Sequence, residues 1–486
     1  MLSDLLAGVG LVAAAAASGA AILLPPGRLR AAAMLLALAL FPVLIVGDQW
    51  HNPQIVDLRH HVDRVVVLLA IGAAVVAALT YLFRRWAVLL PLAIVFALPF
   101  RVPLHAGGES ANLLVPLYLV IAAGVVAAAA RDWPLRRQDP PAAGSTWLPR
   151  ILAAAVLLYA LQALYSTDFS KGLQNVCFFL VPFTIVYALL QDVRWDRRLL
   201  RWVLTVVGVE ATAFVLVGGV ELATRSLFWN DQIIRSNEFH TYFRVNSVFW
   251  DPNVYGRYLA LATVIAAAAL LWARTREAFW LLSGLILVLW IGLVPTFSQS
   301  SFLALLAGLA MLAAIRWSWR WTLAAVAVGA IGAILVVLLV GGSGKITTNR
   351  INVDLSGRGS LISGGADLFS ERPIQGYGSG SFQAAYKEHR SNKDLPVTVS
   401  HTEPVTVAAE QGLIGLVVYL ALIGVALWTL GRGLWSTPTA ARAAILAAFV
   451  ALLVHTLAYA GFFEDPITWV LLAVGASLAQ TVREPA

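Results

Sequence analysis

The stretch Leu5–Leu24, LLAGVGLVAAAAASGAAILL, runs for twenty residues without a charged side chain. A helix needs about 20 apolar residues to cross the hydrocarbon core of a bilayer. Similar runs recur along the chain, at 31–47, 64–83, 86–99, 112–130, 150–165, 176–191, 202–224, 253–273, 278–295, 299–315, 321–341, 404–430, 441–460 and 466–482. Because several of these runs are short, we predict an all-α polytopic membrane protein with about 12–15 transmembrane helices.

The composition of the 486-residue chain supports this prediction. Hydrophobic residues make up 60% of it and charged residues 12%, whereas soluble domains have about 45–50% and about 25%. The mean hydropathy of +0.80 excludes a soluble enzyme, a disordered chain and a nucleic-acid-binding protein. Cys177 is the only cysteine, so no internal disulfide and no cysteine metal cluster is expected.

The charges predict the orientation in the membrane. Alternate connecting segments are arginine-rich and hold 19 of the 34 Lys and Arg with 6 of the 26 Asp and Glu, a balance of +13. The rest of the chain holds the other 15 Lys and Arg and the other 20 Asp and Glu, a balance of −5. The two balances add up to the net charge of +8. The positive-inside rule places the arginine-rich set in the cytoplasm. The N-terminus is then outside and the C-terminus cytoplasmic. No Lys or Arg precedes Arg28, so we expect no standard cleavable signal peptide.

Three parts follow from this topology. We expect an N-terminal transmembrane bundle at 1–341, one large extracytoplasmic loop at 342–403 and C-terminal transmembrane helices at 404–486. The loop is by far the longest polar stretch. ATP is absent from the outer face, so an enzyme acting there needs a substrate that carries its own activation.

The end of this loop holds the first group of candidate functional residues. His401 stands just before Pro404, which suits the first turn of a helix. A neutral imidazole at this boundary is able to accept a proton from a hydroxyl, although a hydrogen-bonded interfacial histidine is the simpler interpretation. Glu403 and Glu410 lie close by as candidate substrate-binding residues, as does Tyr377. The last belongs to the sequence GYGSG, which we interpret as a tight turn rather than a phosphate loop.

The second group lies in the stretch FRVNSVFWDPNVYGR, residues 243–257. Asp251 before Pro252 predicts a helix N-cap, and Asn253 and Arg257 share one face of that helix. A buried arginine in a membrane marks a functional or a paired site, so Arg257 either binds substrate or pairs with Glu210 or snorkels. Arg244 and Arg358 offer fork-shaped donors for a phosphate or diphosphate. A further polar segment, Thr296–Ser301, is predicted to be a hairpin cap.

These segments resemble one family. The order Ser356-Gly-Arg358, ERPIQGYGSGSF and HTEPVTVAAEQGLIGLVVYL, preceded by FRVNSVFWDPNVYGRYLA, resembles the O-antigen ligase and Wzy-type polymerase superfamily. The resemblance implies an all-α, GT-C-like membrane glycosyltransferase at the outer face of the cytoplasmic membrane. Its donor is a glycan on undecaprenyl diphosphate and its acceptor a hydroxyl of a lipid or glycan. His401 corresponds to the general base, and Arg358 and Arg244 to the residues that stabilise the leaving diphosphate.

The resemblance also implies a metal-independent, inverting reaction with no cofactor. This chain departs from the family pattern in two places. Ser298-Gln299 stands where Ser-Arg is usual, so either Arg257 or Arg350 supplies that charge or the substrate differs. His401 is followed by Thr402 rather than asparagine.

Several functions stay open from the sequence. A ligase moves a finished glycan to lipid A core or a protein, whereas a polymerase joins repeat units, and both share the motifs. A transporter or flippase is a second class, but we find no repeated halves, and the ionisable residues cluster at the outer boundary. A non-catalytic scaffold in envelope assembly is the third.

Overall fold

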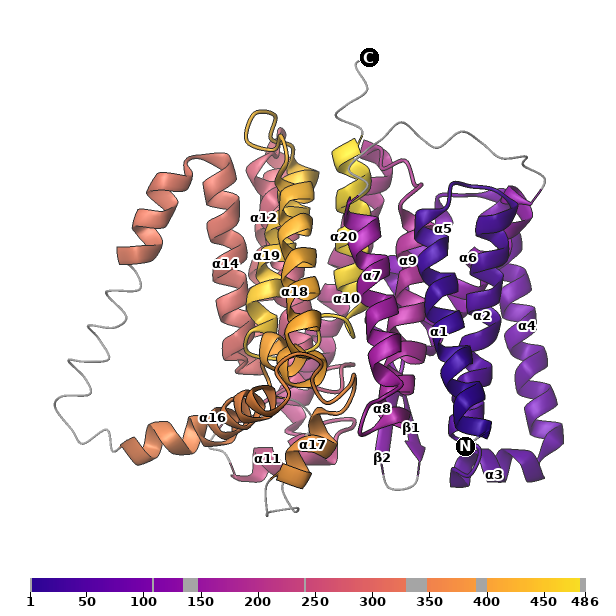
Figure 1. Cartoon of the computed structure of the whole chain (residues 1–486). Helices are drawn as coiled ribbons and strands as arrows, with labels where there is room; N and C mark the ends of the chain where they lie inside the picture. The colour runs from indigo at the N-terminus through magenta and orange to yellow at the C-terminus, as the bar shows by residue number, and fades with distance from the viewer. Residues whose placement is uncertain are drawn as a thin grey trace.

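The computed structural model describes residues 2–106, 109–133, 147–239, 242–328, 348–389 and 400–480. Some side chains in these ranges lie outside the description, among them those of 103–106, 109–112 and 348–358. Most helices run roughly parallel to one another, and shorter elements gather at the lower end in Figure 1. We call this end the site end.

The first half of the chain alternates long and short elements. They are α1 (Leu2–Leu23), α2 (Arg28–Asp48), α3 (Pro53–His60), α4 (Val62–Arg85), α5 (Leu89–Ala97), β1 (Val102–Ala106), β2 (Glu109–Leu113), α6 (Val115–Asp132), α7 (Trp147–Ala163), α8 (Phe169–Asn175), the π-helix η1 (Val176–Leu180), α9 (Val181–Leu190), α10 (Arg197–Thr224) and α11 (Asp231–Phe239).

The second half contains the large loop and the helices around it. Its elements are α12 (Pro252–Leu271), α13 (Arg276–Leu293), the 3₁₀ turn η2 (Val294–Thr296), α14 (Gln299–Arg316), α16 (Thr348–Glu371), α17 (Phe382–His389), α18 (Glu403–Gly431), α19 (Ala440–Thr456) and α20 (Pro466–Gln480). Two of these helices, α16 and α17, lie within the predicted loop at 342–403.

The described residues confirm a polytopic helical membrane protein. Ten helices are long and apolar enough to cross a membrane, and three shorter apolar helices, α7, α19 and α20, add to them. Residues 319–328 are helical, and the rest of the span predicted at 321–341 lies outside the described residues. One short antiparallel hairpin, β1–β2, accompanies the helices of this all-α architecture. The run predicted at 86–99 forms only the nine-residue α5.

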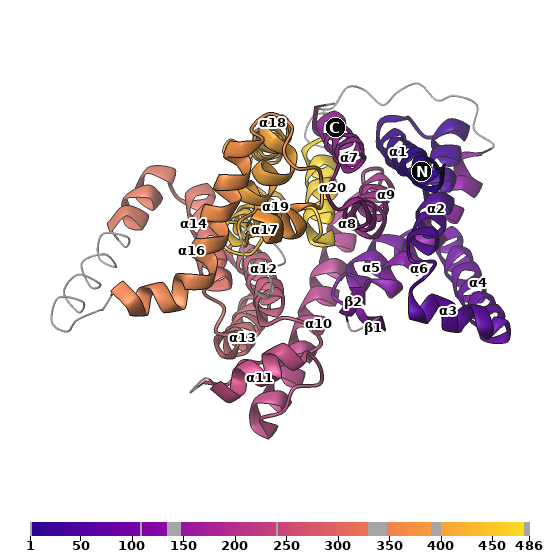
Figure 2. The ribbon, with the colours of Figure 1, turned by 60° about the horizontal axis from the view of Figure 1, so that its bottom comes forward.

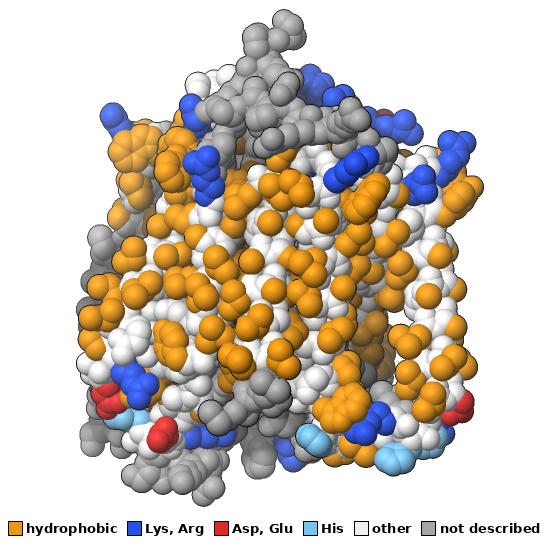
Figure 3. All heavy atoms as spheres, turned by 45° about the vertical axis from the view of Figure 1, so that its right-hand side comes forward, with side chains coloured by type: hydrophobic (Ala, Val, Ile, Leu, Met, Phe, Trp, Pro, Cys, Tyr) orange, Lys and Arg blue, Asp and Glu red, His pale blue; other side chains and the backbone are white. Residues whose placement is uncertain are grey.

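The two ends of the bundle differ in charge. The N-terminus, α3, α11, α16 and α17 lie at the site end, and the C-terminus leaves from the opposite end (Figure 1). On the face shown in Figure 3, Lys and Arg line the upper edge, whereas the lower edge carries Asp, Glu and His side chains together with several Lys or Arg. This arrangement agrees with the predicted alternation of the connecting segments. Which end faces the cytoplasm stays a prediction.

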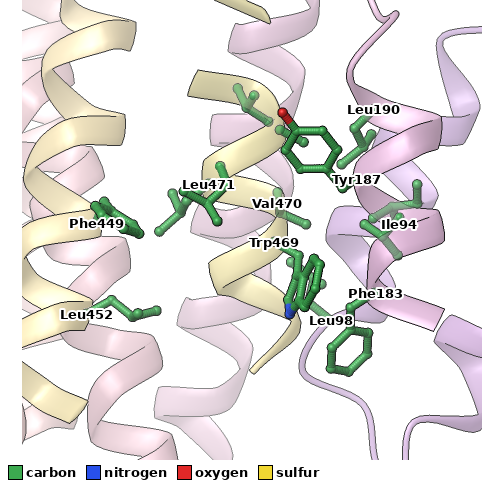
Figure 4. Close-up of a cluster of buried hydrophobic side chains, with 14 of the residues drawn as sticks. Ile94, Leu98, Phe183, Tyr187, Leu190, Phe449, Leu452, Trp469, Val470 and Leu471 are labelled. Carbon is green, nitrogen blue, oxygen red and sulfur yellow. The ribbon is translucent and has the colours of Figure 1, made fainter. Parts of the chain in front are cut away.

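The core joins the last helix to the first half of the chain. Phe183 and Tyr187 of α9 pack beside Trp469 of α20, and Phe449 of α19 lies on the other side of α20 (Figure 4). Each of these rings is at most 1% exposed. The indole N–H of Trp469 donates to the carbonyl of Phe463 at 3.0 Å, so its polar atom is satisfied inside the apolar core. This packing fixes the loop before α20, which contributes to the candidate site.

Candidate functional site

Two helices at the site end begin with the same Asp-Pro pair. Asp251 precedes α12, and its Oδ1 accepts a hydrogen bond from the N–H of Asn253 at 2.6 Å. Asp465 precedes α20, and its Oδ1 accepts from the N–H of Ile467 at 2.9 Å. Each carboxylate satisfies a backbone donor that the helix leaves free. The predicted N-cap at Asp251 is therefore confirmed.

Arg257 is buried one turn into α12, with 4% of its surface exposed. Its Nη2 lies 3.0 Å from Oδ2 of Asp465. The expected pairing with Glu210 is therefore wrong: the carboxylate of Glu210 accepts instead from the hydroxyl of Tyr258 at 3.1 Å. Neighbouring residues of a helix point in different directions, so Arg257 faces α20 while Tyr258 faces α10. Among the described residues, Nη1 of Arg257 has no hydrogen-bond partner.

Arg101 joins this charge cluster from the segment after α5. Burial lowers its pKa, the carboxylate of Asp465 raises it, and the guanidinium of Arg257 lowers it. The sequence analysis missed Arg101 and Asp465. Two signals were present: Arg101 follows an apolar run on the side where arginine is scarce, and Asp465-Pro466 repeats the pattern of Asp251-Pro252.

Tyr459, between α19 and α20, lies where these groups meet. Its ring centroid is 6.5 Å from that of His401 and 5.7 Å from that of His455. Burial raises the pKa of Tyr459, the carboxylate of Asp251 raises it further, and the guanidiniums of Arg257 and Arg101 lower it. The charges at the start of α12 and in the segment after α5 therefore act on the hydroxyl of a tyrosine whose ring lies 6.5 Å from that of the candidate base.

His401 has a left-handed backbone, with φ of 62°. This conformation is uncommon outside glycine and is held only where neighbouring contacts fix it. Here the contacts come from both sides. The Ser400 hydroxyl lies 2.8 Å from the carbonyl of Thr402 and 2.8 Å from the hydroxyl of Thr406, and the Thr402 hydroxyl donates to the carbonyl of Leu457 at 3.1 Å. The imidazole is thus presented at the start of α18 by a fixed turn.

Arg244 connects the segment before α12 to the turn between α13 and α14. Its Nε donates to the carbonyl of Thr296 at 2.9 Å, and its Nη2 donates to Oδ1 of Asn253 at 3.2 Å. Asn253 also accepts, through its carbonyl, from the hydroxyl of Ser301 at 3.4 Å. The guanidinium therefore lies beside the first turn of the helix that carries Arg257.

The segment Thr296–Ser301 is a polar hairpin cap, as predicted. The side chain of Ser298 accepts a hydrogen bond from the N–H of Ser301 at the start of α14. In addition, the hydroxyl of Ser300 lies 3.1 Å from Nε2 of the buried His455. The cap thus joins α14 to α19 through His455, whose ring lies beside that of Tyr459.

The sequence GYGSG forms a turn that is fastened to a break in α18. Gly412 has φ of 63°, so the helix is interrupted there and nearby carbonyls lose their intrahelical partners. The N–H of Tyr377 donates to the carbonyl of Ala409 at 3.1 Å, and that of Gly378 to the carbonyl of Glu410 at 2.7 Å. The Glu410 carboxylate accepts from the N–H of Gly380 at 2.8 Å and of Phe382 at 3.1 Å. The interpretation as a tight turn is confirmed.

The remaining candidates lie around this core of the site. Glu403, 7% exposed, accepts through Oε2 from the N–H of Gly461 at 2.7 Å and of Phe462 at 3.1 Å. The hydroxyl of Tyr377 donates to Glu371. Arg358 belongs to α16, and its side chain lies outside the described part of the chain, as does that of Arg350.

The structure therefore brings together candidates that are far apart in the sequence. Asn253 and Arg257 of α12, with Asp251 before it, meet Arg244 on one side and the segment between α19 and α20 on the other. Figure 2 shows α12 beside α19. His401 reaches the same region through Tyr459, and Glu403 through Gly461. Glu410 and Tyr377 belong to the GYGSG turn.

The comparison with protein families gives one match. Residues 284–420 match the family model Wzy_C, described as O-antigen ligase. This match supports membership of the O-antigen ligase/Wzy family. The family segment runs from α13 into α18 and contains Arg358, Tyr377, His401, Glu403 and Glu410.

Arg244 bonds to Asn253 and to Thr296, and Ser301 bonds to Asn253, so helix α12 is attached to the matched residues 284–420. Arg257 of α12 therefore belongs to the site although it lies outside the matched residues. Arg101, Tyr459 and Asp465 also lie outside the matched residues. No curated protein matches the chain.

Proposed function

We propose that this member of the family is a membrane glycosyltransferase that acts as an O-antigen ligase. It transfers a glycan from undecaprenyl diphosphate to an acceptor hydroxyl at the outer face of the cytoplasmic membrane. In this orientation the N-terminus and residues 342–403 are outside and the C-terminus is cytoplasmic. The large loop and the C-terminal helices together enclose the reaction site.

The proposed reaction needs one base and one site for a leaving anion. His401 accepts the proton of the acceptor hydroxyl, whose oxygen then bonds to the anomeric carbon of the donor sugar. The bond from that carbon to the diphosphate oxygen breaks, and the electron pair leaves with undecaprenyl diphosphate. Arg257, Arg244 and Arg101, with Arg358 by family resemblance, stabilise the negative charge that develops on this oxygen. The donor's own diphosphate bond supplies the activation.

One observation carries the proposal: arginines from separate segments converge beside a histidine held in an uncommon conformation. Arg257 and Arg101 both act on Tyr459, which lies next to His401. Nη1 of Arg257 is buried without a hydrogen-bond partner among the described residues. Such a donor is costly to leave unpaired, and an anionic substrate group satisfies it. Arg101 lies in the same cluster as a residue that the family segment does not contain.

The proposal is tested with inside-out and right-side-out vesicles supplied with lipid-linked glycan. We expect His401→Ala, Arg257→Ala and Arg101→Ala each to lower transfer at least a hundredfold, since a general base contributes about 10²–10⁴-fold and one charged donor about 10²–10³-fold. His60→Ala is the matched control, because His60 is exposed on α3 at the same end. Full transfer by folded His401→Ala protein would refute the role of the base.

The product separates the two members of the family. A ligase gives a single transferred glycan, whereas a Wzy-type polymerase gives a ladder of repeat units. A ladder in this assay would assign the polymerase reaction to the same residues.

A further inference from the structure

A polar cavity lies next to the arginine cluster, on the other side of Gly461. Its lining comes from α7, α8 and η1, from Gly380 and α17, from α18, and from residues 460–464 before α20. Gly461 lines the cavity, and a Cβ placed on it would lie 4.0 Å from Nη1 of Arg257. The N–H of the same glycine donates to Glu403, whose side chain also lines the cavity. The cavity and the cluster are therefore neighbouring compartments.

The two compartments differ in charge. The cluster holds the guanidiniums of Arg101 and Arg257 with the carboxylate of Asp465, whereas the cavity is lined by the carboxylates of Glu403, Glu410 and Glu464 with one ammonium, Lys171. A diphosphate is repelled by such a lining, and an acyl or prenyl chain would leave the charged groups of the lining without polar partners. Hydroxyl groups suit it, because they donate to carboxylates and accept from an ammonium.

A buried amide in the lining also points to a missing partner. Asn175 is 6% exposed and donates through Nδ2 to the hydroxyl of Tyr159 at 2.8 Å. Its Oδ1 has no hydrogen-bond partner among the described residues. Buried polar atoms are almost always paired in proteins, so an unpaired one on a cavity wall indicates a place for a ligand donor. Gln383 of α17 adds a further amide to the lining.

The backbone next to Asn175 is altered in a way that is frequent at functional sites. The π-helix η1 follows this residue directly, and Leu180 at its end lines the cavity. Pro182 has no N–H to donate to the carbonyl of Phe178, four residues earlier. The hydroxyl of Tyr118 donates to this carbonyl at 2.8 Å, so the irregular turn is stabilised from α6. The widened turn thus belongs to a supported structure.

We infer that this cavity binds an uncharged sugar ring of the glycan substrate while the arginine cluster binds the diphosphate. The inference rests on the proposed function and names the compartment for the carbohydrate. Asn175, Gln383 and Glu464 make the hydrogen bonds that orient the ring. The ring belongs either to the donor, next to the anomeric carbon, or to the acceptor. The lining disfavours a uronic acid, because its carboxylate would face three others.

Binding is tested first without catalysis, on the full chain in nanodiscs. Saturation-transfer NMR is recorded with methyl glucoside, methyl galactoside and glucuronate. We expect signals from at least one neutral sugar and a signal at least tenfold weaker from glucuronate. Gln383→Ala should weaken neutral-sugar binding about fivefold, the effect of losing one hydrogen bond. Gln191→Ala is the control, because Gln191 follows the last residue of α9 and does not line the cavity. It should leave binding unchanged. Equal binding of glucuronate, or no effect of Gln383→Ala, would overturn the inference.

Kinetics then identify the source of the ring. We expect Gln383→Ala and Glu464→Gln to raise the KM of one substrate about fivefold while kcat stays within twofold. A rise in the KM of the lipid-linked donor assigns the ring to the donor, and a rise in that of the acceptor assigns it to the acceptor. Unchanged KM values for both would overturn the inference while the transfer reaction stands. Absence of transfer by the wild-type protein would refute the proposed function, and the NMR result would still decide the cavity.

Discussion

At the scale of single residues, Asp251 and Asp465 cap helices in the same way but differ in their second partner. Asp251 bonds the N–H of Asn253, whereas Asp465 caps α20 and also pairs with the buried Arg257. Asparagine caps a helix about as well as aspartate does. The replacement of aspartate by asparagine therefore keeps both caps and removes the charge alone.

This difference gives a matched pair of variants. We expect Asp465→Asn to lower the free energy of unfolding by about 3–5 kcal/mol, because it leaves the guanidinium of Arg257 buried without its counter-charge. Asp251→Asn should change it by less than about 1 kcal/mol. Thermal unfolding in detergent measures both. Equal stability of the two variants would contradict the buried ion pair.

Gly412 offers a second test at this scale. Its φ is 63°, and a Cβ there would lie 2.3 Å from the carbonyl oxygen of Ile374. We expect Gly412→Ala to destabilise the protein by more than the ~1–2 kcal/mol that the left-handed conformation alone costs. Gly424→Ala in the same helix is the control, since a Cβ at Gly424 meets no atom within 4 Å. A Gly412→Ala protein as stable as the control would show that the break in α18 is not required.

Sequence patterns predicted some of these residues and not others. The cap at Asp251 follows from two adjacent letters, and the position of His401 before Pro404 follows from the start of a helix. The partner of Arg257 does not follow from such a local pattern, because Glu210 and Asp465 both lie far from Arg257 in sequence. Only the packing of α12 against its neighbours selects Asp465. Arg101 was missed because an arginine after an apolar run has many possible roles.

At the scale of elements, the GYGSG turn and the break in α18 form one unit. Four backbone donors of residues 377–382 bond to Ala409 and Glu410. The sequence predicted the turn and the helix separately, since each has a local signal. It gave no sign that α18 would be interrupted, because residues 404–430 are mostly apolar over the length of one long span and glycine is common in membrane helices. The hairpin β1–β2 was missed because its strands are only five residues long.

The carboxylate of Glu410 is the test of this unit. Glu410→Ala leaves the N–H groups of Gly380 and Phe382 without their acceptor, at about 1–3 kcal/mol each. We expect chymotrypsin to cleave at Tyr377 and Phe382 at least tenfold faster in this variant, because the turn opens more often. Glu388→Ala, an exposed residue of α17, is the control. Cleavage at the wild-type rate would show that Glu410 does not hold the turn.

At the scale of the whole molecule, the bundle has two chemically different ends. The number of spans and the alternation of charged segments were predictable, because bilayer thickness and the positive-inside rule act on local composition. The pairing of the helices was not predictable, since lipid-facing and core-facing apolar residues look alike in sequence. Thus α9 and α20 share a core although the chain between them is very long.

The orientation has its own test. On a Cys177→Ala background, we expect a membrane-impermeant maleimide to label Glu388→Cys, in α17, on intact spheroplasts and to leave Ser436→Cys, between α18 and α19, unlabelled. Both positions are exposed in the structure, so accessibility to the reagent depends on the side of the membrane. The reverse pattern would place the site end in the cytoplasm, away from a donor presented at the outer face.

The central claim is that the lipid-linked donor binds where Arg101, Arg257 and His401 meet. A photo-crosslinking amino acid at position 459 tests this directly, with the same group at Trp50 as the control, an exposed aromatic residue after α2. We predict that light attaches the lipid-linked glycan to position 459 and not to position 50, and that Arg257→Ala abolishes the product. Crosslinking at Trp50 alone, or equal crosslinking at both positions, would contradict the account.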